Sequence, residues 1–108
     1  MSIPKVTIVD YGMGNIFSVV SAFKYLGAEV EIVSDPEEIL KSSILVLPGV
    51  GSFRNAMEFI RERNIDEAII DAVSNNGVKI LGICLGMQLL GSFSTENGKT
   101  AGLGFLPN

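Results

Sequence analysis

Histidine is absent from this chain, and cysteine is nearly so. A thiol or hydroxyl nucleophile normally works beside a base, usually histidine, so this absence is the strictest constraint on any catalytic interpretation. The one cysteine, Cys84, cannot form an intrachain disulfide. A lone thiol is typical of a reducing compartment, which predicts a cytoplasmic location.

Long apolar segments are also missing. The longest stretch without a charge, residues 80–95, is interrupted by three glycines and by Gln88. It is shorter than the roughly 20 apolar residues that span a bilayer. Near the start, Lys5 and Asp10 bracket too few apolar residues for a signal peptide. We therefore expect neither a membrane protein nor an exported one.

Basic charge is scarce as well. Lys and Arg total 8 against 12 for Asp and Glu, so the net charge is −4, and no basic run occurs. This balance argues against nucleic acid or an anionic membrane as the main partner. With 47% hydrophobic residues the chain is not disordered, and its 108 residues suffice for one small domain with a real core.

Short apolar runs alternate with helical patterns along the chain. Strands are predicted at residues 5–10, 29–33, 43–47 and 78–83. Apolar residues at helical spacing, including Leu26, predict a first helix that stops at Gly27. Further helices are expected from Pro36, capped by Ser34 or Asp35, and over residues 53–60 and 65–73. This order predicts an α/β fold: an open, mostly parallel sheet with helices on both faces. Residues 92–108 look like a loop that leads toward more structure.

Gly-Ile-Cys-Leu-Gly at residues 82–86 follows an apolar strand and precedes a segment that can form a helix. This is the nucleophile-elbow pattern with cysteine in place of serine. Gly82 and Gly86 would lack side chains because a Cβ atom would collide with neighbouring backbone. The helix N-terminus would favour the thiolate of Cys84, and the Leu85 amide would face a developing oxyanion. The alternative is a buried structural cysteine between two packing glycines.

Two other loops follow predicted strands. Pro-Gly-Val-Gly at residues 48–51 lies at the carboxyl edge of the sheet and could supply a second oxyanion donor, or it could be an ordinary turn. Residues 10–15 suggest a dinucleotide fingerprint, but Phe17 stands where the third glycine is needed, so NAD binding is not expected. Asn15 would simply cap the first helix. No base for Cys84 is evident, since Lys5 and Lys79 lie on strands away from that edge.

Together, Asp-Tyr-Gly-Met-Gly-Asn at 10–15, Leu-Pro-Gly-Val-Gly at 47–51 and Gly-Ile-Cys-Leu-Gly-Met-Gln-Leu-Leu at 82–90 resemble class I (triad-type) glutamine amidotransferases. They are most similar to the glutaminase subunits of imidazole glycerol phosphate synthases. The resemblance implies a truncated, flavodoxin-like fold. It also implies that Cys84 attacks the carboxamide of glutamine and releases ammonia through a thioester.

The same resemblance assigns the other site residues. Backbone amides of Leu85, Val50 and Gly51 would bind the oxyanion, with the loop over residues 49–51 rearranging to do so. Gly49, Gln88 and Glu96 would hold glutamine. Without the resemblance, Gln88 is a solvent-facing helix residue and Glu96 a loop acid. No metal or cofactor is implied.

The family's domain is about twice this size. Residues 1–108 would then be its N-terminal half, and the catalytic His and Glu would lie in the other half. We therefore expect the chain alone to lack glutaminase activity and to expose an apolar edge. The expected partner is a (β/α)8 cyclase subunit that receives ammonia for histidine biosynthesis, in a heterodimer.

Three alternatives remain open on the sequence. The chain could serve a surface-polysaccharide sugar amidotransferase, whose glutaminases carry nearly the same motifs. It could be a non-catalytic flavodoxin-like interaction module with an inert Cys84, an interpretation supported by the missing histidine. A cysteine-elbow esterase shares the nucleophile but does not explain Gln88 or the loop at Pro48.

Overall fold

The computed structural model describes residues 4–12, 16–49, 51–83, 85–91, 93–94 and 100–105. Five parts of the sequence-based prediction, namely Asn15, Val50, Cys84, Glu96 and the end of the chain from residue 106, lie outside these residues.

Strands and helices alternate in the predicted order. The strands are β1 (Lys5–Val9), β2 (Glu29–Val33), β3 (Ile44–Leu47), β4 (Lys79–Gly82), β5 (Phe93–Ser94) and β6 (Thr100–Ala101). The helices are α1 (Ile16–Tyr25), α2 (Pro36–Leu40), α3 (Phe53–Glu62), α4 (Ile65–Asn76) and α5 (Leu85–Leu89). Asp35, rather than Ser34, caps α2: its side chain accepts a hydrogen bond of 3.1 Å from the amide of Glu37.

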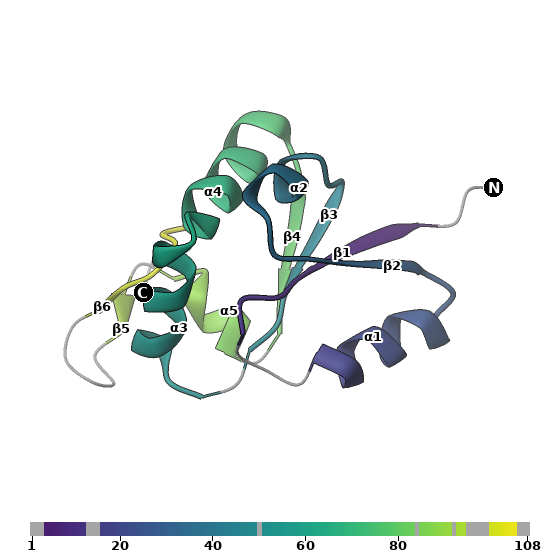
Figure 1. Cartoon of the computed structure of the whole chain (residues 1–108), viewed down its shortest axis with the longest axis horizontal. Helices are drawn as coiled ribbons and strands as arrows, with labels where there is room; N and C mark the ends of the chain where they lie inside the picture. Colours follow the sequence, from purple (N-terminus) through teal and green to yellow (C-terminus); the bar gives the residue numbers. More distant parts are fainter. Residues whose placement is uncertain are drawn as a thin grey trace.

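The first four strands form one parallel sheet in the order β2-β1-β3-β4. Ile8 in β1 lies opposite Ile32 of β2 and Val46 of β3, and Val46 lies opposite Leu81 of β4. Figure 1 shows α1 on one side of this sheet and α2, α3 and α4 on the other. The predicted open α/β architecture with helices on both faces is confirmed.

The two faces of the sheet are covered unequally. On the side of α3 and α4, a large buried cluster joins the sheet to both helices and includes Phe53, Met57 and Ile60 of α3. On the other side, the buried cluster among the described residues consists of Val6, Ile8 and Val46, beneath half-buried residues of α1. One helix is too narrow to cover four strands, so Ile32 is 46% and Leu81 48% exposed. Both residues belong to the outer strands of the sheet, β2 and β4.

Two details of the prediction are wrong. Leu26 was expected on the buried stripe of the first helix, but α1 ends at Tyr25 and Leu26 is exposed, because the chain turns away at Gly27. The segment expected to be a loop includes the antiparallel pair of β5 and β6, with Phe93 opposite Ala101. Strands of two residues are too short to carry a periodic signal. Separately, no helix in the described part of the chain is long and apolar enough to cross a membrane.

The packing of α4 can be tested with two neighbouring isoleucines. Ile69 is fully buried in the large cluster, whereas Ile70 is 39% exposed. We expect Ile69→Ala to lower the free energy of unfolding by about 2–5 kcal/mol, because it removes buried methyl groups and leaves a cavity. Ile70→Ala should cost much less. Urea denaturation measures both, and equal losses would contradict this packing.

Candidate active site at the carboxyl edge of the sheet

The turn between β4 and α5 is tight and is tied to the end of β3. The amide of Ile83 donates to the carbonyl of Leu47 at 3.0 Å, and the amide of Gly86 donates back to the carbonyl of Ile83 at 2.9 Å. The strand therefore ends and the helix begins within a few residues. Cys84, the predicted nucleophile, lies between these bonded residues in the sequence and outside the described part of the chain.

The two glycines of the predicted elbow have no room for a side chain. A Cβ atom at Gly82 would lie 2.6 Å from the Cα of Met87, and one at Gly86 would overlap the carbonyl oxygen of Leu47. In both cases the obstacle is backbone, which cannot move aside as a side chain can. The sequence-based explanation of these glycines is confirmed.

The loop after β3 meets the start of α5. The carbonyl of Gly49 accepts a 3.1 Å hydrogen bond from the amide of Leu85, one of the predicted oxyanion donors. Gly51, another predicted donor, is exposed and has a φ of 103°, which favours glycine. The sequence predicted that both loops lie at one sheet edge, and this is confirmed. The structure adds that the Leu85 amide is already bonded.

Tyr11, in the loop after β1, is a third component of this edge that sequence reasoning missed. Its side chain is fully buried, and its hydroxyl donates a 2.5 Å hydrogen bond to the carbonyl of Pro48. A Cβ atom at Gly49 would overlap the same hydroxyl. Burial raises the pKa of the Tyr11 hydroxyl above its ordinary value. The available signal was a tyrosine at the carboxyl end of a buried strand, where a hydroxyl needs a partner.

The remaining predicted residues are distributed as follows. Gln88 is exposed on α5, which fits both a substrate-facing and a solvent-facing residue. Lys5 and Lys79 are the first residues of β1 and β4, so both stand at the amino ends of parallel strands, away from the elbow. Among the described residues, no group of three His, Cys, Asp or Glu side chains could hold a metal ion.

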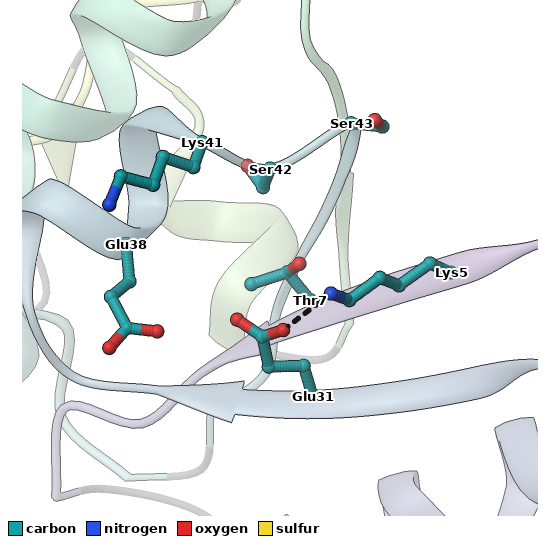
Figure 2. A pocket seen from close by; sticks show the side chains of 7 residues that line it. All are labelled: Lys5, Thr7, Glu31, Glu38, Lys41, Ser42 and Ser43. Atoms are coloured by element: carbon teal, nitrogen blue, oxygen red, sulfur yellow. Dashed lines mark ion pairs between the residues drawn. The ribbon is translucent and has the colours of Figure 1, made fainter.

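A polar pocket of about 330 Å³ lies away from this edge, between α2 and the amino-terminal parts of β1 and β3. Figure 2 shows the seven residues that line it: Lys5, Thr7, Glu31, Glu38, Lys41, Ser42 and Ser43. Lys5 and Glu31 form an ion pair of 2.7 Å, which raises the pKa of Lys5 and lowers that of Glu31. Both groups are solvated, so their attraction is weak. None of the residues predicted to act on substrate lines this pocket.

The close approach at Gly86 can be separated from ordinary glycine strain. Gly86→Ala would push a methyl group into the Leu47 carbonyl, and we expect a loss of about 3 kcal/mol or more in the free energy of unfolding. Gly27→Ala is the control, because nothing lies within 4 Å there and only its φ of 91° opposes a side chain. That strain costs about 1–2 kcal/mol. Urea titrations that rank Gly27→Ala as the more damaging would contradict the elbow geometry.

The burial of Tyr11 predicts a pH effect. The unfolded chain releases the Tyr11 proton near pH 10, whereas the folded chain holds it to higher pH, so stability is complete below about pH 10 and falls above it. We expect Tyr11→Phe to remove this part of the alkaline decline in urea titrations between pH 7 and 11. Tyr25→Phe, at a side chain that is 90% exposed, should keep it. A decline of equal steepness in Tyr11→Phe would be evidence against the buried hydroxyl.

The sequence of this chain was compared with those of known proteins. The sequence model of class-I glutamine amidotransferases matches residues 7–102. The chain is 48% identical over 103 residues to imidazole glycerol phosphate synthase subunit HisH 1 of Parasynechococcus marenigrum (strain WH8102), covering 95% of this chain and 49% of that protein. It is 52% identical over 102 residues to imidazole glycerol phosphate synthase subunit HisH of Bacillus cereus (strain G9842), and the match covers 94% of this chain and 48% of that protein.

A solved structure described as a glutamine amidotransferase shares the fold. The two structures superpose with a TM-score of 0.77 at 23% sequence identity. The match covers 91% of this chain and 51% of the other chain. The chain spans about half the length of the curated relatives it matches. On the strength of the match over residues 7–102, the chain belongs to the class-I glutamine amidotransferase family.

Proposed function

We propose that residues 1–108 form the N-terminal half of a glutamine amidotransferase domain and carry its nucleophile, Cys84. The observation that supports this most is the pair of backbone contacts that exclude a side chain at Gly82 and Gly86. These glycines flank position 84 between the end of β4 and the start of α5. A tight junction of strand and helix is the setting in which an elbow presents its nucleophile.

In the proposed reaction, the Cys84 thiolate attacks the carboxamide carbon of glutamine and forms a tetrahedral intermediate. Collapse of this intermediate breaks the C–N bond, and ammonia leaves once its nitrogen has received a proton. Water then hydrolyses the resulting thioester to glutamate and restores the thiol. The proton transfers need an acid and a base, which we assign to the His and Glu of the family's other half.

The tetrahedral intermediate carries an oxyanion that needs hydrogen-bond donors. We assign this role to the backbone amides of Leu85, Val50 and Gly51. The bond from the Leu85 amide to the Gly49 carbonyl means that the loop after β3 has to move before Leu85 can act. The loop rearrangement that the family resemblance implies would therefore break a specific hydrogen bond, the one between the Leu85 amide and the Gly49 carbonyl.

Glutamine itself would be held by Gly49, Gln88 and Glu96. The exposed position of Gln88 on α5, four residues after Cys84, leaves its amide free to meet a ligand. The relatives called HisH are described as subunits of imidazole glycerol phosphate synthase. We extend that role to this chain: ammonia passes to a (β/α)8 cyclase subunit, in a cytoplasmic heterodimer that serves histidine biosynthesis. Relatives at about 50% identity do not favour the polysaccharide alternative.

Selective labelling of the only thiol tests the proposal. The probes are a chloromethyl ketone analogue of glutamine and iodoacetamide, and intact-mass spectrometry follows the single adduct at Cys84. We expect the ratio of the two rates to be about tenfold higher in the folded chain than in urea, because a formed site orients the analogue at the thiol. Free glutamine should slow labelling by the analogue alone.

Two neighbouring variants on α5 serve as the matched pair. Gln88→Ala should lower the rate ratio without changing the iodoacetamide rate, whereas Met87→Ala, also at an exposed side chain, should leave both unchanged. A rate ratio that is the same in the folded and the unfolded chain would favour the inert, non-catalytic module instead.

A further inference from the structure

The amide of Leu85 cannot serve two acceptors at full strength. In the structure it donates to the carbonyl of Gly49 at 3.1 Å. A backbone N–H is a single donor, so an oxyanion can receive this hydrogen bond only after Gly49 releases it. Whatever holds the Pro48–Gly49 segment in place therefore controls how often the Leu85 amide is available.

Tyr11 contacts this segment directly. Its hydroxyl donates to the carbonyl of Pro48 at 2.5 Å, and the Pro48–Gly49 peptide is planar, so this bond fixes the orientation of the whole peptide unit. The same hydroxyl occupies the space where a Gly49 side chain would lie. A displacement of the Pro48 carbonyl requires this buried hydrogen bond to break.

Tyr11 is anchored in turn from α3. Arg63, just beyond the end of that helix, donates from Nη1 to the backbone carbonyl of Tyr11 at 3.0 Å. Its guanidinium lies 5.4 Å from the ring centre of Phe59. The contacts thus connect the ends of β1, β3 and β4, which are neighbours in the sheet.

We propose that the Tyr11 hydroxyl is a positioning group that keeps the oxyanion site closed by fixing the loop after β3 on the Leu85 amide. This inference rests on the proposed function, in which the Leu85 amide receives the oxyanion. Tyr11 does not touch the substrate in this role. It acts through Pro48 and Gly49, and its loss shifts the loop toward the conformation in which the amide is free.

Amide hydrogen exchange of the full chain, followed by NMR, tests this directly. We expect Tyr11→Phe to raise the exchange rate of the Leu85 amide about tenfold relative to that of Ile83, which donates to Leu47 in the same turn. Tyr25→Phe makes the same chemical change at an exposed site and should alter neither rate. If Tyr11 were merely structural, both amides would accelerate together, and a ratio that stays constant overturns the proposal.

A second variant covers the case in which Tyr11→Phe does not fold. Gly49→Ala places a methyl group against the Tyr11 hydroxyl and should also raise the Leu85 to Ile83 exchange ratio. Adding Tyr11→Phe to Gly49→Ala removes the overlapping hydroxyl and should restore stability lost by the alanine. If Gly49→Ala leaves the ratio unchanged, the hydroxyl does not position the loop.

The labelling experiment distinguishes this failure from failure of the proposed function. Labelling of Cys84 that is selective for the glutamine analogue, together with an exchange ratio that Tyr11→Phe does not change, would support the proposed function and contradict the positioning role of Tyr11. If the exchange ratio responds but labelling shows no selectivity, the contact holds the loop, and its link to an oxyanion is wrong.

Discussion

The close approach of α5 to the end of β3 is the constraint on which the rest of the candidate site depends. Gly86 packs against the Leu47 carbonyl with no room for a methyl group, and the Ile83 amide donates to that same carbonyl. Backbone meets backbone here, so no rotamer change can absorb an added side chain. This contact brings the loop after β3 beside the turn that contains position 84, and both proposed oxyanion elements follow from it.

The Tyr11 hydroxyl and the Gly49 carbonyl make this edge a satisfied hydrogen-bond network rather than a set of free donors. The Tyr11 hydroxyl donates to the buried carbonyl of Pro48, and the Gly49 carbonyl accepts from the Leu85 amide. Leaving such buried polar groups without partners would destabilise the fold. Because the Leu85 amide already donates to the Gly49 carbonyl, it is not available as a donor to a reacting carbonyl. Under the proposed function, the loop after β3 has to release the Leu85 amide before the amide can bind an oxyanion.

The two faces of the sheet are covered to different extents. The face under α3 and α4 has a complete core, while Ile32 and Leu81 on the other face remain substantially exposed. The apolar surface beside α1 is thus only partly covered within the described residues.

Local patterns were enough to predict the alternation of strands and helices, the bounds of β2 and the need for glycine at residues 82 and 86, because periodicity and short-range sterics act between neighbours in sequence. The partner of the Leu85 amide, 36 residues away at Gly49, and the burial of Tyr11 against Pro48 were decided only by the tertiary structure. Hydrogen bonds between distant segments depend on which loops the sheet brings together and on how closely they pack, and no spacing along one segment reports that.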